Sequence, residues 1–160
     1  MTTPRSGPNG PSSDQTTTPT RDATTPTFRV LEAHGDDAAQ WAAILEAWQA
    51  REVFAFPGYL DLFAGDGGRP ILAVLTRGGL TTVQPLVLRD LRETAWWDGE
   101  ARYDTVSAPF GYAGPFVMGP DGERPDDATR AGELAAFFAA YQGWAREIGL
   151  VAEYVTLDPK

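Results

Sequence analysis

Residues 71–88 read Ile-Leu-Ala-Val-Leu-Thr-Arg-Gly-Gly-Leu-Thr-Thr-Val-Gln-Pro-Leu-Val-Leu, and this stretch decides the fold. Two apolar runs of strand length flank Arg77-Gly-Gly79, which has the residue types of a tight hairpin turn. The pattern therefore predicts antiparallel strands at Ile71–Leu75 and Leu80–Leu88. Pro85 lies inside the second run and lacks an N–H group, so we expect a bulge or a sheet edge there.

Towards the N-terminus, the sequence predicts a short strand at Phe28–Leu31 and two helices. Asp37 and Gln40 have the spacing of a capping box before the first helix. Its apolar side chains then recur with helical spacing, at Trp41, Ile44, Leu45 and Trp48. Pro57 favours the first turn of a second, shorter helix, which carries Tyr59, Leu60, Leu62 and Phe63.

Towards the C-terminus, the pattern predicts strand, helix and strand. Gly114–Met118 is a candidate strand, and Asp126 or Asp127 can cap the long helix that follows. That helix has an apolar stripe that places Phe138 in the core, formed by Leu134, Phe138, Tyr141, Ala145 and Ile148. Gly149 is placed to end it, and Val151–Leu157 is a final strand.

The order strand-helix-helix-strand-strand-strand-helix-strand predicts an α+β fold with α/β-type layers. A hairpin together with a strand-helix-strand crossover requires a mixed, mostly antiparallel sheet with flanking helices. Residues 1–26 are expected to be a disordered tail, because 18 of them are Ser, Thr, Pro or Gly. The domain is expected to span residues 27–160.

Composition excludes several classes of function. The formal net charge is −9, which disfavours binding to DNA or another phosphate backbone. With no cysteine and one histidine, thiolate chemistry and Cys- or His-rich metal sites are excluded. No apolar run reaches the roughly 18 residues of a membrane helix, and the N-terminus has no hydrophobic signal segment. These features predict a cytoplasmic protein with no transmembrane segment.

One stretch carries a family resemblance: Asp104-Thr-Val-Ser-Ala-Pro-Phe-Gly-Tyr-Ala-Gly-Pro115. It resembles the D-x-x-S-x-P-Y-G-Y-x-G-P segment of GNAT-like proteins related to the Fem-type (FemAB-like) peptidoglycan-bridge aminoacyltransferases, with Phe110 where the family usually has Tyr. The order of elements resembles the first of the two GNAT-like halves of those enzymes. By this resemblance the candidate substrate-binding residues are Asp104, Ser107, Phe110, Gly111, Tyr112, Gly114 and Pro115.

The resemblance implies transfer of an acyl or aminoacyl group to an amine, with a small molecule or cell-wall precursor as acceptor. In a full-length protein, acyl-CoA or aminoacyl-tRNA would be the donor. Here the loop Gly119–Asp127 lacks the donor-binding glycine pattern and has four carboxylates against one arginine, so we expect no cofactor in this chain. We further expect a half-domain that is incomplete and inactive alone, whose open Val151–Leu157 edge favours self-association.

The residues themselves leave other interpretations open. The motif can be a sheet-closing loop in which Gly111 and Gly114 supply positive φ. The whole chain can be a stand-alone non-catalytic module that binds a sugar or peptide through the aromatic loop, or a structural remnant. Separately, Trp96-Trp97 can stack on a sugar. His34 and Glu153 are expected at solvated positions. The sequence indicates no catalytic residue.

Overall fold

The computed structural model of the protein describes residues 25–65, 67–100, 102–107 and 114–156. In these ranges six strands form one open, mixed sheet of the order β1-β2-β3-β4-β6, with β5 also paired to β3. The strands are β1 (Thr27–Glu32), β2 (Gly68–Arg77), β3 (Leu80–Asp90), β4 (Tyr103–Val106), β5 (Phe116–Met118) and β6 (Leu150–Tyr154). The pairing of β4 with β6 is parallel and the others are antiparallel, which confirms the predicted fold class.

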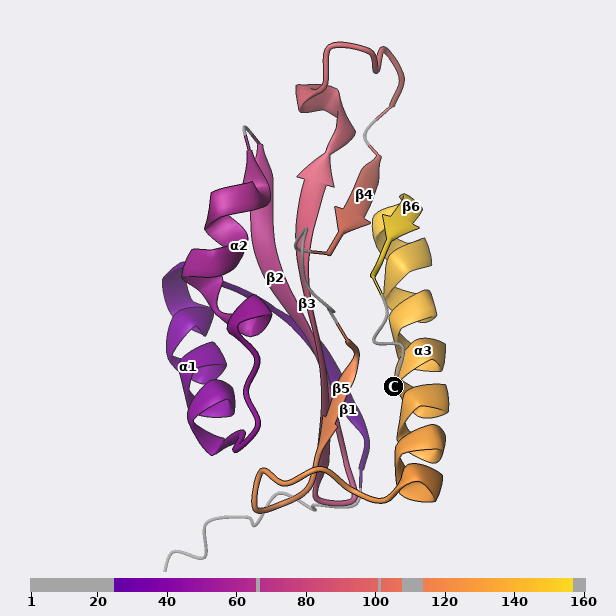
Figure 1. The fold of residues 1–160 in the computed structure, drawn as a ribbon. Coiled ribbons are helices and arrows are strands. Elements are labelled where there is room, and N and C mark those ends of the chain that lie inside the picture. Colours follow the sequence, from indigo (N-terminus) through magenta and orange to yellow (C-terminus); the bar gives the residue numbers. More distant parts are fainter. Residues whose placement is uncertain (1–24, 66, 101, 108–113, 157–160) are drawn as a thin grey trace, which may run out of the picture.

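Helices cover both faces of this sheet (Figure 1). Two helices, α1 (Ala38–Ala47) and α2 (Pro57–Ala64), lie on one face, and the long α3 (Asp127–Ile148) lies on the other. All three were predicted, and Asp37 is at the N-cap of α1 as expected, but its side chain makes no capping hydrogen bond. A 3-10 turn, Gly35–Asp37, precedes α1, and the Asp37 carboxylate accepts a hydrogen bond from the Glu32 N–H at 3.1 Å instead.

The sequence pattern missed strand β4, which together with β5 forms one interrupted strand beside β3. β4 pairs with Val87–Asp90 and β5 with Thr81–Val83, both antiparallel, and residues 108–113 between them lie outside the described residues. Pro85 lies opposite this interruption and keeps regular register with Leu72 of β2. The expected bulge is therefore absent, whereas the expected edge is found locally, on the side of β3 that faces away from β2. The proline loses no ladder hydrogen bond because β3 has no partner there among the described residues.

The orientation of α3 also differs from the predicted stripe. As expected, the Asp126 carboxylate caps its start by accepting the Thr129 N–H at 2.9 Å, and Gly149, with φ 74°, ends it. However, Phe137 is fully buried, whereas Phe138 is 38% exposed. Two neighbouring phenylalanines fit two helical stripes equally well, and only packing against the sheet selects one.

The sheet separates two hydrophobic clusters. One lies under α1 and α2, and its largest members include Trp41, Trp48 and Leu60. The other lies under α3 and includes Ile71, Leu86 and Phe137. In the part of the chain that the structure describes, none of the helices combines the length and apolar character that crossing a bilayer requires.

Candidate functional site

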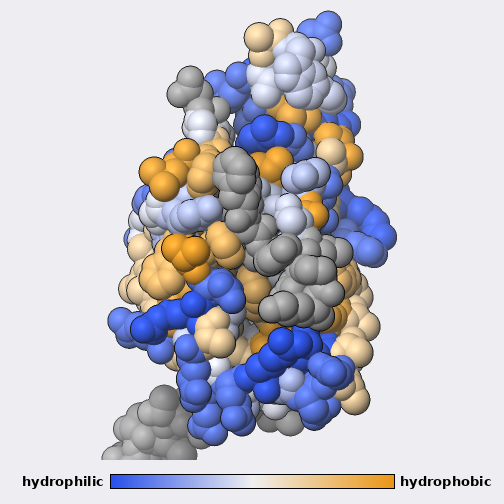
Figure 2. Space-filling view, viewed as in Figure 1, coloured by the Kyte–Doolittle hydropathy of each residue, from blue (hydrophilic) through white to orange (hydrophobic). Residues whose placement is uncertain are grey.

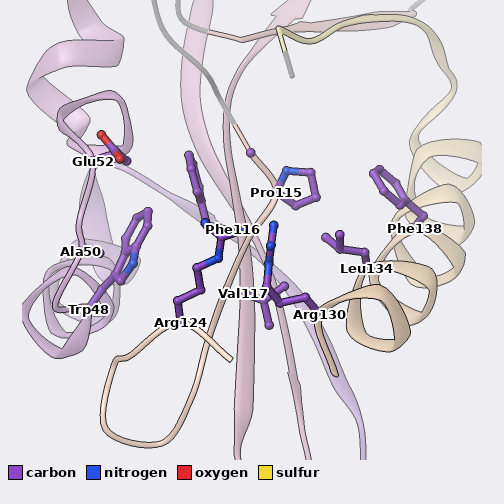
Figure 3. Close-up of a pocket in the computed structure, with 11 residues that line it drawn as sticks. Trp48, Ala50, Glu52, Pro115, Phe116, Val117, Arg124, Arg130, Leu134 and Phe138 are labelled. Atoms are coloured by element: carbon purple, nitrogen blue, oxygen red, sulfur yellow. The ribbon is translucent and has the colours of Figure 1, made fainter. Parts of the chain in front are cut away.

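A cleft of about 370 Å³ opens between the end of α1, strand β5 and the first half of α3 (Figure 3). It lies beside β3 at the start of β5. Most of its wall is apolar, formed by Trp48, Pro115, Phe116, Val117, Leu134 and Phe138. The charged side chains among its lining residues are Glu52, Arg124 and Arg130. Concave, mostly apolar surfaces with a few polar groups are typical of small-molecule sites.

Tight local packing forms the α1 side of the cleft. The rings of Trp48 and Phe116 lie 4.9 Å apart, so an aromatic pair joins the end of α1 to β5. Gly114 has a φ of 79°, and a Cβ there would come within 2.7 Å of the Phe116 ring. The sequence therefore needs glycine at this position, and the ring of Phe116 takes the space that a side chain would fill.

The loop between β5 and α3 is fixed to the end of α1 by backbone contacts. The Gln49 N–H donates to the Gly122 carbonyl at 3.1 Å, and the Gln49 side-chain amide donates to the Asp121 carbonyl at 2.8 Å. Gly122 has a φ of 76°, and a Cβ there would lie 1.7 Å from the Ala47 carbonyl oxygen. This close approach holds the loop, and Arg124 with it, at the mouth of the cleft.

Two guanidinium groups point into the cleft between Trp48 on the α1 side and Leu134 and Phe138 on the α3 side (Figure 3). Arg130 donates to the Asp127 carboxylate at 3.0 Å, and Arg124 lies 3.9 Å from the same group. The Asp127 side chain is 93% exposed. A single solvated carboxylate thus lies beside both arginines.

The acidic loop does not give the cleft the negative lining that its composition suggests. Within this fully described loop, none of the four carboxylates lines the cleft, and Asp126 is occupied as the helix cap. Figure 2 shows strongly hydrophilic residues gathered over the lower part of this face, where Figure 1 has the same loop, with hydrophobic residues above them.

The structure divides the motif residues into separate places. Asp104 is buried in β4 and accepts two hydrogen bonds from Arg89, at 2.8 and 2.6 Å. Ser107 is also buried; its N–H donates to the Tyr154 carbonyl at 2.8 Å, and its hydroxyl accepts the Thr156 N–H at 3.1 Å. Both therefore hold strands together. Gly114 and Pro115 line the cleft, and Phe110, Gly111 and Tyr112 lie outside the described residues.

A polar cluster that the sequence did not indicate lies between β3, β4, β6 and α3. The Glu153 carboxylate accepts a hydrogen bond from the Gln84 amide at 3.2 Å, and the hydroxyls of Thr105 and Tyr141 lie 3.2 Å apart. Burial raises the pKa of the Glu153 carboxyl above its ordinary value of 4.5, although hydrogen bonds from Tyr141 and Gln84 act to lower it. Glu153 is exposed as a residue, as expected, but its carboxylate is partly withdrawn from solvent by these contacts.

Two polar atoms near this cluster are buried without a partner among the described residues, Thr82 Oγ1 and Gln84 Oε1. Burial also raises the pKa of the Tyr141 hydroxyl. The one signal in the sequence was Gln84, a polar residue inside an otherwise apolar strand. Its partner Glu153 is 69 residues away and gives no local pattern.

The remaining candidate residues lie elsewhere. His34 Nε2 is 3.0 Å from Asp61 Oδ1, and both side chains are exposed. Trp96 is 70% exposed, whereas Trp97 is half-buried and donates its indole N–H to the Glu100 carbonyl. In the described ranges, no three His, Asp or Glu side chains are grouped so that they could hold a metal ion.

Comparison with known proteins gives no relative: no family model, no curated protein and no solved structure matches the chain.

Proposed function

We propose that this chain is the acceptor-binding domain of an acyl- or aminoacyltransferase of the GNAT and Fem type. The observation that carries the proposal is the interrupted strand. The motif begins in β4, and its last two residues, Gly114 and Pro115, lie in the wall of the cleft beside β5. Its two ends are thus fixed to the sheet beside a ligand-sized cleft.

The placement of the buried motif residues supports this role. Asp104 and Ser107 fix the first part of the motif, Asp104 through Arg89 of β3 and Ser107 through Tyr154 of β6. A domain that orients an amine against an acyl donor needs a rigid frame more than a reactive side chain, because orientation alone can lower the barrier substantially. The proposed acceptor is a small amine or a cell-wall precursor with a free amine.

The start of α3 supports the expectation that this domain does not bind the donor. A helix N-terminus can hold a phosphate through its free N–H groups. Here the Asp126 carboxylate already accepts the Thr129 N–H, and hydrogen bonds from Thr129 hold the pKa of Asp126 below its ordinary value. A pyrophosphate would have to displace a carboxylate that stays ionised.

Calorimetric titration tests the proposal with two ligands. The acceptor probe is N-acetylmuramoyl-L-alanyl-D-isoglutamyl-L-lysine, with the same compound acetylated on the lysine amine as its control. We expect the free amine to bind more tightly than the acetylated form. Acetyl-CoA is expected to show no binding at or below about 10 μM, equivalent to about −7 kcal/mol.

A pair of variants locates the binding. Leu134→Trp fills the cleft, whereas Leu62→Trp adds the same side chain at a position on α2 that is 74% exposed. Acceptor binding should weaken at least tenfold in the first variant and stay unchanged in the second. Tight acetyl-CoA binding that Leu134→Trp removes would instead make this chain a donor-binding domain.

A non-catalytic module that binds a sugar or peptide is the second candidate. It is favoured by Trp96, which is 70% exposed and forms an edge-to-face pair with Trp97 at a ring separation of 6.0 Å. A chitin oligosaccharide serves as the probe. Binding that Trp96→Ala removes and Leu134→Trp leaves intact would support this alternative against the transferase proposal.

A further inference from the structure

The two arginines of the cleft are available to an incoming ligand. The Arg130 side chain is 24% exposed and that of Arg124 is 57% exposed. Their carboxylate partner Asp127 lies in solvent at 93% exposure, where an ion pair contributes little to stability. A ligand anion can therefore replace Asp127 without leaving a buried charge unpaired.

The charge of the cleft contrasts with that of the whole chain. The chain carries a formal net charge of −9, but two of the three charged side chains lining the cleft are arginines. A guanidinium presents several N–H donors in one plane and matches a carboxylate or a phosphate with paired hydrogen bonds. A long polyanion would meet the acidic remainder of the surface, whereas one oxyanion inside the cleft meets the arginines first.

The walls indicate what the rest of the ligand is. Trp48 and Phe116 form one aromatic wall, and Leu134 and Phe138 face it from α3. Phe138 is 38% exposed, and its side chain lines the cleft. Such surfaces favour a flat ring or a short alkyl chain, since both gain by leaving water.

We propose that the cleft binds a small apolar ligand that carries a carboxylate or phosphate group, with the oxyanion held by Arg124 and Arg130. The inference rests on the proposed function only in taking this cleft as the ligand site. If the acceptor role holds, the oxyanion belongs to the acceptor, and the amine is carried elsewhere on the same molecule.

Four probes that share one apolar body test this proposal by calorimetry on the full chain. They are 4-phenylbutanoate, 4-phenylbutyl phosphate, the neutral 4-phenylbutanamide and the cationic 4-phenylbutylamine. We expect both anions to bind, the amide to bind at least tenfold more weakly, and the amine to show no binding. Binding of the anions should weaken as salt is added. The comparison of the two anions identifies whether the site prefers a carboxylate or a phosphate.

Variants assign the contact. Arg124→Gln combined with Arg130→Gln should lower anion affinity at least tenfold and leave amide affinity unchanged. Arg69→Gln is the control, because Arg69 is also an exposed arginine with one carboxylate partner, Glu32. Arg130→Lys keeps the charge but loses the paired donors, so its affinity for the anions should lie between those of the wild type and the double variant. Near-identical circular dichroism would show that each variant is folded.

Several results would overturn the proposal. The role of the two arginines would be contradicted if the amide and the anions bound equally well, or if the amine bound best. It would also be contradicted if Arg69→Gln lowered anion affinity as much as the double variant does. The absence of binding by every probe at millimolar concentration would contradict it as well. The two anionic probes carry no amine, so they test the oxyanion site separately from acceptor binding. If the anions bind and the muropeptide does not, this inference holds and the proposed function is rejected. If the muropeptide binds and the anions do not, the proposed function holds and this inference is rejected.

Discussion

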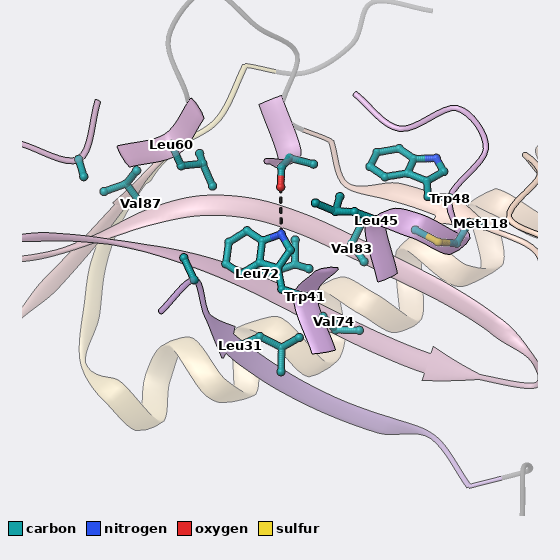
Figure 4. Close-up of a cluster of buried hydrophobic side chains, with 13 residues drawn as sticks. Leu31, Trp41, Leu45, Trp48, Leu60, Leu72, Val74, Val83, Val87 and Met118 are labelled. Carbon is teal, nitrogen blue, oxygen red and sulfur yellow. Dashed lines mark hydrogen bonds between the residues drawn. The ribbon is translucent and has the colours of Figure 1, made fainter. Parts of the chain in front are cut away.

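On the face of the sheet covered by α1 and α2, the large buried cluster is apolar and the buried Asp104 at its end is paired with Arg89, whereas the face covered by α3 buries more polar groups. Figure 4 shows the first cluster, in which the drawn hydrogen bond joins the Trp41 indole N–H to the Ala55 carbonyl at 3.0 Å. Under α3, the buried Glu133 pairs with Arg77 at 2.6 Å, and Thr82, Gln84 and Thr105 are also buried.

The alternation of side chains along β3 produces this difference. Val83 and Val87 face α1 and α2, whereas Thr82, Gln84 and Leu86 face α3. Buried polar groups lower stability unless they are paired. We infer that Thr82 Oγ1 and Gln84 Oε1, which are buried without a partner among the described residues, make the α3 face the less stable of the two.

The largest expected effect is on the apolar face. Trp41 is fully buried, and Trp41→Ala should lower the free energy of unfolding by about 3–5 kcal/mol, since it leaves a cavity and an unpaired Ala55 carbonyl. Urea denaturation followed by circular dichroism measures this. Trp96→Ala, at 70% exposure, is the control and should change it by less than about 0.5 kcal/mol. Similar costs for the two would contradict the assignment of the core.

The next comparison lies within α3. Phe137→Ala should cost about 3–5 kcal/mol, because its ring is fully buried against Phe28 and Tyr141. Phe138→Ala should cost about 1 kcal/mol or less, since its side chain is 38% exposed in the cleft wall. The same denaturation experiment on both variants is sufficient. The reverse order would restore the stripe predicted from the sequence.

A smaller effect of opposite sign is expected at Thr82. Its hydroxyl is buried without a partner among the described residues, so Thr82→Val should raise the free energy of unfolding by about 1 kcal/mol. Thr105→Val provides the contrast, because the Thr105 hydroxyl has the Tyr141 hydroxyl 3.2 Å away. That variant should be destabilised. If both valines destabilise equally, Thr82 has a partner, and the α3 face is better satisfied than its described contacts show.

The smallest effect is a pH dependence at Glu153. Because burial raises the pKa of Glu153 in the folded state, the ionised carboxylate opposes folding, and stability is lost as pH rises from 4.5 through the raised pKa. In thermal denaturation, the melting temperature of Glu153→Gln should rise relative to that of the wild type as the pH increases across this range. Asp90 gives the opposite sign: Arg92 lowers its pKa to about 2, so its contribution is present above 3.8 and is lost as pH falls towards 2. Parallel pH profiles for wild type and Glu153→Gln would contradict the raised pKa of this carboxyl group.

Several features of the candidate site were predictable and others were not. The motif led to Gly114 and Pro115, which line the cleft, but equally to Asp104 and Ser107, which join strands. Nothing in the sequence led to Arg124 and Arg130 as a pair in one cleft. They are separated by a helix start, and their convergence depends on the loop that Gly122 fixes against α1. The self-association expected at the sheet edge stays a prediction, although β6 does lie at the edge of the described sheet, with Val151 and Tyr154 exposed.

The sequence alone determined the elements whose signals are local. The hairpin at Arg77-Gly-Gly79, the helix start at Asp126 and the helix end at Gly149 each depend on a few neighbouring residues and a backbone preference. Tertiary structure alone decided whether Phe137 or Phe138 faces the core, that Tyr103–Val106 pairs as a strand, and that Glu153 meets Gln84. These outcomes depend on contacts between distant residues, and their energies are set by packing and burial, which no local pattern in the sequence records.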